Sequence, residues 1–190
     1  MRKSDYKINK FILNRWSSRA MNGEKISNEE LMTLFEAARW APSSLNNQHW
    51  RFIYAERGSK YWDGFFNLLF EGNQKWCNNA AILIIMISKK KYDMKDEEIR
   101  TRSFDAGSAW ENLALQAITI NLVVHPIGGF DVIKAREVAK VPYDYEIEIM
   151  IAVGKKGKKE DLSEELRKKE VMSDRKPLNQ IVFEGNFHER

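Results

Sequence analysis

The sequence is poor in the residues on which cysteine and metal chemistry depends. Its 190 residues include a single cysteine, Cys77. One cysteine excludes an intramolecular disulfide and any zinc or iron–sulfur site built from several thiolates. The three histidines, His49, His125 and His188, lack metal-ligand spacing, so no metal site is expected. Because no histidine lies near Cys77 in the sequence, we expect a buried structural thiol rather than a nucleophile.

Long hydrophobic runs are also missing. The longest one, residues 80–87, falls far short of the ~20 residues that a membrane-spanning helix needs. The first ten residues carry charges throughout and contain no apolar signal-peptide core. We therefore expect a cytoplasmic protein with no membrane partner.

Glycine and proline are scarce, at 10 and 4 residues. Neither G-x-G-x-x-G nor G-x-x-x-x-G-K-[ST] occurs, which excludes a dinucleotide-binding fingerprint of the Rossmann type and a P-loop. A G-x-S-x-G nucleophile elbow is absent as well. Since no repeat, low-complexity tract or Pro/Gly/Ser-rich linker interrupts the chain, residues 1–190 are expected to form a single domain.

The sequence does contain a modest excess of positive charge. Its 31 lysines and arginines exceed its 27 acidic residues, for a net charge of +4. Most basic residues fall in short clusters near acidic ones, which is typical of solvated surface. Residues 15–19 (Arg-Trp-Ser-Ser-Arg) differ, because hydroxyls alternate with guanidinium groups. That combination favours one small phosphate over a polyanion, and we expect no nucleic-acid partner.

Hydrophobic periodicity predicts helices and strands without a regular β-α-β repeat. Ser27-x-x-Glu30 is a capping box, followed by apolar residues at helical spacing up to Pro42. Residues 104–120 carry a broad apolar stripe of helical period, and residues 81–88 are typical of a strand buried on both faces. Helices are also expected over residues 5–14, 60–70 and 163–170 and after an N-cap at Asp131, and strands over residues 50–55, 122–125 and 146–153, the last one amphipathic. This mixture favours an α+β fold over a doubly wound sheet.

A polar loop joins the helix that ends near Pro42 to the strand that begins at Trp50. It contains Ser43, Ser44 and three carboxamide side chains. All of these residue types are ordinary turn formers. They would also suit a hydrogen-bonding wall for a planar heteroaromatic ligand. Taken alone, the composition of this loop favours an ordinary turn over a ligand-binding surface.

Four sequence blocks change that interpretation, because they occur together and in order. They are Arg15-x-Ser17-x-Arg19, then Glu36-Ala37-Ala38-Arg39-Trp40-Ala41-Pro42-Ser43-Ser44-x-Asn46-x-Gln48-x-Trp50, then Pro126-x-Gly128-Gly129-Phe130-Asp131, and finally Arg175-Lys176-Pro177-Leu178. Over about residues 11–187 the chain thereby resembles the nitroreductase family of flavoproteins. The resemblance implies a nitroreductase-like α+β fold, with a central, mostly antiparallel sheet flanked by helices. It also implies an intertwined homodimer that binds FMN at the interface.

The resemblance further implies which residues bind the cofactor. Arg15, Ser17 and Arg175 would hold the FMN phosphate, and Arg19 would lie towards the ribityl chain and the pyrimidine edge of the flavin. The other expected cofactor contacts are Trp16, Pro42, Ser43, Ser44, Asn46, Asn73, Gly128 and Gly129, with Ser43, Ser44 and Asn46 coming from the partner subunit. The flavin itself would carry out the chemistry, so no side chain is expected to be catalytic.

The activity implied by the resemblance is that of an FMN-dependent NAD(P)H oxidoreductase. Hydride would pass from NADH or NADPH to FMN and then, in a ping-pong cycle, to small-molecule acceptors such as nitroaromatics or quinones. A non-catalytic flavin carrier or redox-sensing module of the same fold is the alternative.

Some residues depart from the family pattern. His49 replaces a frequent proline, and Trp76 falls where some members have a cationic residue near the flavin. Arg19 is then the main residue expected to tune the flavin. His125 precedes the Pro-Ile-Gly-Gly loop, either as a structural residue or as a contact for substrate or flavin, and the structural role is favoured.

Overall fold

The computed structural model describes residues 2–93 and 95–187 and centres on a four-stranded sheet. The strands are β1 (Trp50–Glu56), β2 (Ile82–Lys89), β3 (Leu122–Ile127) and β4 (Tyr145–Lys155). Their order is β1-β2-β4-β3, and each neighbouring pair is antiparallel. The expected antiparallel sheet of an α+β fold is confirmed.

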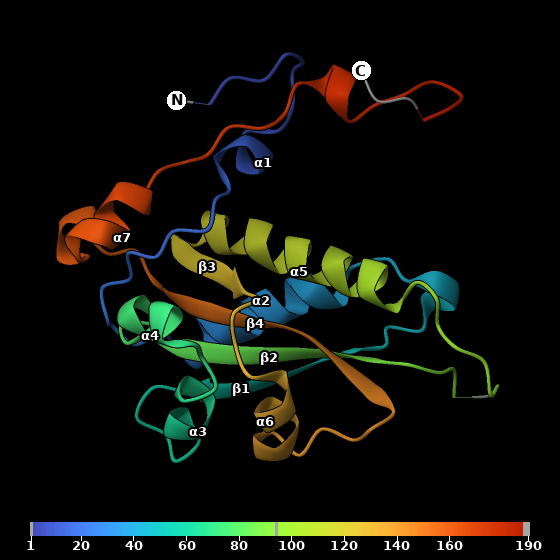
Figure 1. Cartoon of the computed structure of the whole chain (residues 1–190), viewed down its shortest axis with the longest axis horizontal. Helices are drawn as coiled ribbons and strands as arrows, with labels where there is room; N and C mark the ends of the chain where they lie inside the picture. Colours follow the sequence, from blue (N-terminus) through green and yellow to red (C-terminus); the bar gives the residue numbers. More distant parts are fainter. Residues whose placement is uncertain (1, 94, 188–190) are drawn as a thin grey trace.

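Helices cover both faces of this sheet (Figure 1). The helices α2 (Asn28–Arg39) and α5 (Arg102–Thr119) pack on one face, and α3 (Trp62–Phe66), α4 (Glu71–Cys77) and α6 (Val132–Val138) pack on the other. Successive side chains of a strand point to opposite faces. Ile84 of β2 therefore belongs to the core under α5, and Ile85 belongs to the core under α3. The prediction that this apolar strand is buried on both faces is confirmed.

Two helix starts follow directly from their capping residues. The Ser27 hydroxyl accepts from the main-chain N–H of Glu30 at 3.1 Å, and the Glu30 carboxylate accepts from the N–H of Ser27 at 2.6 Å. Asp131 caps α6 by accepting from the N–H of Lys134 at 3.0 Å. Both caps are where the sequence predicted them, because a cap depends on residues that are close in the chain.

Other elements differ from the prediction. The helix α1 spans only Lys10–Asn14, shorter than the predicted helix over residues 5–14, and its apolar side chains Phe11 and Ile12 are exposed. The predicted helix over 60–70 is reduced to α3, and α4 had no counterpart in the prediction. Its seven residues contain no apolar side chain before the last two, so they show no helical stripe. The strand β4 is buried on both faces from Met150 onward rather than amphipathic, since helices cover both sides of the sheet.

The N-terminal segment and the C-terminal arm lie close together, away from the sheet (Figure 1). After α7 (Glu164–Lys169), the chain is extended, apart from a short 3-10 turn at Leu178–Gln180. The guanidinium group of Arg2 donates to the main-chain oxygen of Ser173 at 2.8 Å, and to those of Leu13 and Arg15 at 3.2 and 2.7 Å. These bonds fasten the C-terminal arm to the N-terminal segment. Within residues 2–93 and 95–187, no helix has the length and apolarity to cross a membrane.

Candidate functional site

Arg15 and Arg175 are far apart in the sequence, and both lie near Arg2. The pKa of Arg2 is held below its usual value, mainly by partial burial and then by the positive charges of Arg175 and Arg15. The carboxylate next to Arg15 is Glu111, 3.6 Å from its Nε. The hydroxyl of Ser17 lies 3.5 Å from the Arg15 Nη1. Arg15 and Arg175 both repel Arg2, and such a group of guanidinium side chains favours the binding of an anion.

The main chain beside Arg19 is held by a buried carboxylate. Glu170, which ends α7 and is 5% exposed, accepts hydrogen bonds from the N–H groups of Arg19 at 3.0 Å and Ala20 at 3.1 Å. It also accepts a short hydrogen bond from the hydroxyl of Ser18. The residue that fixes the Arg19 segment therefore begins the arm that carries Arg175.

Asn73 and Gly129 are in direct contact. The Asn73 amide donates to the Gly129 oxygen at 2.9 Å and accepts from the indole N–H of Trp76 at 3.3 Å. The ring of Trp76 lies 4.5 Å from the ring of His125, centroid to centroid. His125 Nδ1 in turn lies 3.1 Å from the main-chain oxygen of Ser18. These contacts connect the loop of Gly128 and Gly129 to residues 15–19, the segment that contains Arg15 and Arg19.

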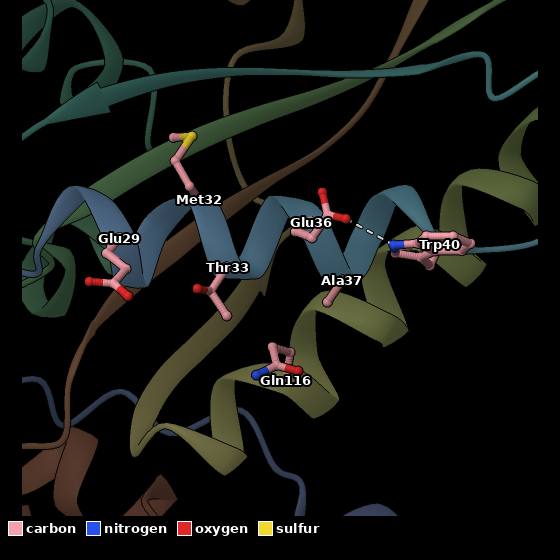
Figure 2. Close-up of a pocket in the computed structure, with 7 residues that line it drawn as sticks. All are labelled: Glu29, Met32, Thr33, Glu36, Ala37, Trp40 and Gln116. Atoms are coloured by element: carbon pink, nitrogen blue, oxygen red, sulfur yellow. Dashed lines mark hydrogen bonds between the residues drawn. The ribbon is translucent and has the colours of Figure 1, made fainter.

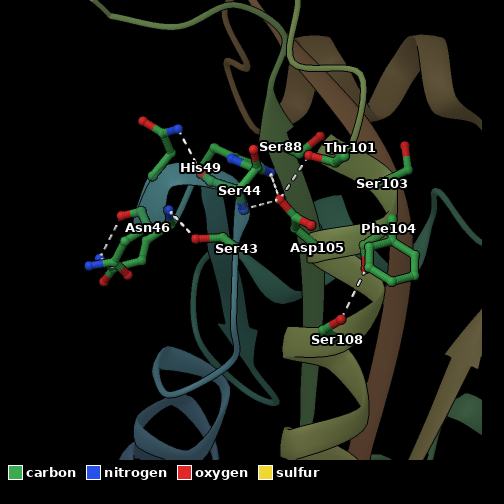
Figure 3. A network of polar contacts seen from close by, with 12 residues as sticks. Ser43, Ser44, Asn46, His49, Ser88, Thr101, Ser103, Phe104, Asp105 and Ser108 are labelled. Atoms are coloured by element: carbon green, nitrogen blue, oxygen red, sulfur yellow. Dashed lines mark hydrogen bonds and ion pairs between the residues drawn. The ribbon is translucent and has the colours of Figure 1, made fainter.

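The polar loop after α2 contacts the first turn of α5, apart from the residues described above, and its backbone is strained. Leu45, Asn46 and Gln48 have φ angles of 53°, 55° and 48°, a left-handed conformation that costs roughly 1–2 kcal/mol for each such residue. Figure 3 shows the contacts that hold this loop. The Ser43 hydroxyl accepts from the N–H of Gln48 at 3.0 Å, and the N–H of Ser44 donates to the carboxylate of Asp105 in α5 at 2.9 Å.

This loop and the arginine segment contact different parts of α5: the loop contacts its first turn, and the arginine segment contacts its middle and its far end. Asp105 lies in the first turn of α5, whereas Ile118, near the other end, lines a surface hollow together with Trp16 and Ser18. Ile118 is thirteen positions after Asp105, about 20 Å along the helix axis, and Glu111, the ion-pair partner of Arg15, is six positions after it, about 9 Å. The predicted cofactor residues thus form two groups: one contains Arg15, Trp16, Ser17, Arg19, Asn73, Gly128, Gly129 and Arg175, and the other contains Pro42, Ser43, Ser44 and Asn46.

Comparison with known proteins identifies the family. A model of the nitroreductase family matches residues 12–155, which is most of the chain. The chain belongs to the nitroreductase family. In this family member the match includes both groups of candidate residues except Arg175, which lies beyond its end.

Individual relatives agree with this assignment. The crystal structure of an oxidoreductase containing FMN is 39% identical in sequence to this chain and matches its fold with a TM-score of 0.95. The match covers 100% of this chain and 97% of the chain in that structure. Protein DrgA from Synechocystis sp. is 28% identical over 168 residues, which are 70% of this chain and 75% of DrgA. The major NAD(P)H-flavin oxidoreductase of Aliivibrio fischeri is 31% identical over 90 residues, which are 45% of this chain and 41% of that protein.

Gly128 and Gly129 of this nitroreductase-family chain differ in the space around them. A Cβ atom on Gly129 would lie 2.7 Å from the amide nitrogen of Asn73. A Cβ atom on Gly128 would meet nothing within 4 Å. A side chain at position 129 would therefore displace Asn73, whereas one at position 128 would displace no protein atom. At Gly128 the open backbone leaves room for a flat ligand to approach, which fits an isoalloxazine ring.

The surroundings of His125 and Cys77 in this nitroreductase-family fold agree with the structural roles expected for them. Burial lowers the pKa of His125 to about 4, while the hydrogen bond to Ser18 acts in the opposite direction. At neutral pH the ring is uncharged, and it must carry its proton on Nδ1 to donate to the Ser18 oxygen. Cys77 is fully buried, and burial raises the pKa of its thiol, which agrees with the expected structural thiol.

The lowered pKa of His125 predicts a loss of stability in mild acid. In the unfolded chain the ring takes up a proton near its usual pKa of 6.5, but in the folded chain only near pH 4. The free energy of unfolding should therefore be highest above pH 6.5 and should fall as the pH is lowered towards 4. Denaturant unfolding at a series of pH values measures this slope. His125→Asn keeps a donor near Ser18 and should flatten the slope; an unchanged slope would contradict the assignment.

Three residues that support this site have little or no signal in the sequence. Arg2, Asp105 and Glu170 each hold a segment that carries family-motif residues, through side-chain contacts over long sequence separations. Asp105 gave one signal, since it lies four residues before Ala109, on the edge of the buried stripe of α5. Arg2 and Glu170 lie in charged segments and gave none.

Proposed function

We propose that this chain binds FMN and uses it to carry electrons from NADH or NADPH to small organic acceptors, such as nitroaromatics or quinones, in a ping-pong cycle. The observation that carries this proposal is the group of guanidinium side chains from Arg2, Arg15 and Arg175, linked by packed contacts to the open backbone at Gly128. A phosphate suits the first feature and a flavin ring suits the second. The FMN in a structure 39% identical to this chain supports the same cofactor.

The side chains then have distinct roles. Arg15, Ser17 and Arg175 hold the phosphate, whose oxygens match the fork of donors on a guanidinium group. Arg19 places a fixed positive charge near the pyrimidine edge of the flavin, where it stabilises negative charge that develops on reduction. FMN supplies the electron transfer itself. The protein contributes binding, orientation and electrostatics, so no catalytic side chain is required.

We further propose that the functional unit is a homodimer. The first group contacts α5 at Glu111 and Ile118, about 9 and 20 Å along the helix axis from Asp105, which holds the loop of Ser43, Ser44 and Asn46. We infer that a second copy brings this loop to the ring. A partly apolar hollow between α2 and α5 supports this (Figure 2). It is lined by Met32, Trp40 and Gln116, among others, and Trp40 is 73% exposed. Exposed apolar patches of this kind favour protein contacts.

The dimer predicts a particular response to charged substitutions. Met32→Glu combined with Trp40→Glu should convert a species of twice 22.3 kDa into one of 22.3 kDa and lower FMN affinity at least tenfold, because charges would be buried at the interface. Analytical ultracentrifugation and flavin titration measure the two effects. Ile133→Glu is the matched control, since Ile133 is exposed on α6 at the opposite face. Wild-type protein that sediments as a monomer with bound FMN would reject the dimer.

Anaerobic reduction tests the catalytic proposal. Protein saturated with FMN should lose its yellow colour on addition of NADH or NADPH and regain it on addition of a nitroaromatic compound or a quinone. Parallel double-reciprocal plots in steady state are expected for a ping-pong cycle. Bound FMN that neither nicotinamide reduces would instead favour the flavin carrier. Failure to bind FMN at all would refute the proposed function.

A further inference from the structure

We infer that Asp105 is a positioning residue for the flavin: it holds residues 43–48, the loop that lines the ring, in a conformation that the loop would not keep by itself. This inference rests on the proposed function and deepens it. In the proposed dimer, Asp105 of one protomer would act on the flavin bound mainly by the other. Asp105 itself lies outside the four family blocks, although it contacts Ser44 within the second of them.

The backbone of the loop shows why it needs support. Leu45, Asn46 and Gln48 all adopt positive φ, and none of them is glycine. Such conformations persist only where the surrounding structure enforces them, and they concentrate at functional sites. Leu45 is 78% exposed, so its own packing does not enforce its conformation. The constraint must come from the residues that flank the exposed part of the loop.

Asp105 provides the constraint at one end. It is 4% exposed, and its Oδ2 accepts from the N–H of Ser44 at 2.9 Å and from the hydroxyl of Thr101 at 3.1 Å. A buried carboxylate is costly unless hydrogen bonds compensate its charge, so these bonds are directional and strong. The first turn of α5 further stabilises the negative charge through the helix dipole. Ser44 is thereby fixed relative to α5.

His49 provides the constraint at the other end. Its main-chain oxygen accepts from the N–H of Lys89 at 2.9 Å, which ties the end of the loop to β2. Its imidazole is 2% exposed, and Nε2 lies 3.5 Å from the same oxygen of Asp105. Among the described residues, neither ring nitrogen has a hydrogen-bond partner within normal range. Asp105 is therefore the polar group to which both ends of the loop converge.

The consequence for ligand binding follows from where the held residues point. Asn46 lies on the side of the loop away from Asp105 (Figure 3). With Ser44 and His49 anchored, Ser43 and Asn46 are presented outward in one arrangement. Loss of Asp105 releases Ser44 and lets the strained residues relax. The loop then has to be reordered whenever a ring binds, which weakens ring binding but leaves the phosphate contacts unaffected.

Comparison of two flavins separates these contributions. FMN and riboflavin share the ring, and only FMN has the phosphate. Asp105→Ala should lower the affinity for both flavins by the same factor, about tenfold, and should shift the visible absorption bands of the bound flavin. Asp105→Asn keeps the shape and one acceptor oxygen and should restore much of the loss. Thr101→Val removes the other hydrogen bond to the same carboxylate oxygen but leaves Ser44 bound, and should behave nearly as wild type.

Thermal melting of each protein without flavin serves as the folding control. Wild-type affinity for both flavins in Asp105→Ala, with unchanged absorption bands, would overturn the inference, and so would a loss confined to FMN. If Asp105→Ala does not fold, Asp105→Asn carries the test: a smaller but equal loss for both flavins supports the inference, and no loss overturns it. Wild-type protein that binds neither flavin would refute the proposed function as well, which keeps the two failures distinct.

Discussion

Arg15→Ala should weaken FMN binding about 100-fold, the loss expected when a charge-assisted, two-pronged contact to a phosphate is removed. Arg15 is largely buried at the end of α1, and the guanidinium groups of Arg2 and Arg175 lie near it. The substitution removes one positive charge from this group. It also removes the paired N–H donors of the Arg15 guanidinium, which Ser17 and Arg175 do not replace. Fluorescence titration of the protein without flavin measures the dissociation constant.

Riboflavin makes this prediction specific. Without a phosphate, riboflavin should bind Arg15→Ala nearly as well as it binds wild type. Lys158→Ala is the matched control, since Lys158 is an exposed basic residue outside the group, and it should leave FMN binding unchanged. An equal loss of FMN and riboflavin in Arg15→Ala, or an equal loss of FMN in both variants, would remove Arg15 from the phosphate site.

The second large effect is expected at the glycine pair. Gly128→Ala should lower the affinity for both flavins at least tenfold and leave the melting temperature of the protein without flavin unchanged. A methyl group there meets no protein atom within 4 Å, but it would occupy the space through which the ring approaches the backbone. Affinity and melting temperature are measured on the same preparation, by titration and by differential scanning calorimetry.

Gly129→Ala provides the contrast. Its methyl group would lie 2.7 Å from the amide nitrogen of Asn73 and would displace the side chain that bonds to Gly129 and Trp76. This variant should therefore lose stability even without flavin, by about 1–3 kcal/mol. A Gly128→Ala protein with wild-type flavin affinity would show that the ring does not approach this backbone.

The parts of the fold that depend on neighbouring residues were predictable from the sequence. The capping box at Ser27, the N-cap at Asp131 and the apolar run of β2 all lie where the sequence predicted them. The missed helix α4 has no apolar stripe of its own, because Trp76 and Cys77 are its buried side chains. Tertiary packing stabilises such a short helix, and a local pattern does not reveal it.

The residues of the candidate site also fall into those that the sequence reveals and those that it does not. Motif residues such as Arg15 and Gly128 are recognisable because their spacing in the sequence is characteristic. Glu170 and Asp105 are not, because each acts through the main chain of a residue more than fifty positions away. In the sequence Glu170 resembles an ordinary surface acid, and Asp105 differs from one only by its place at the edge of an apolar stripe. The folded chain shows that both are buried.

The separation of the two candidate groups by α5 has a genetic consequence. In the proposed dimer each site takes its phosphate-binding group from one subunit and its ring-lining loop from the other. A subunit with Arg15→Ala and a subunit with Asp105→Ala are then defective in opposite halves of the site. A mixed dimer of the two contains one site in which both defects coincide and one in which neither is present. Co-expression of the two variants would restore a site that neither variant forms by itself, which is complementation between alleles of one gene.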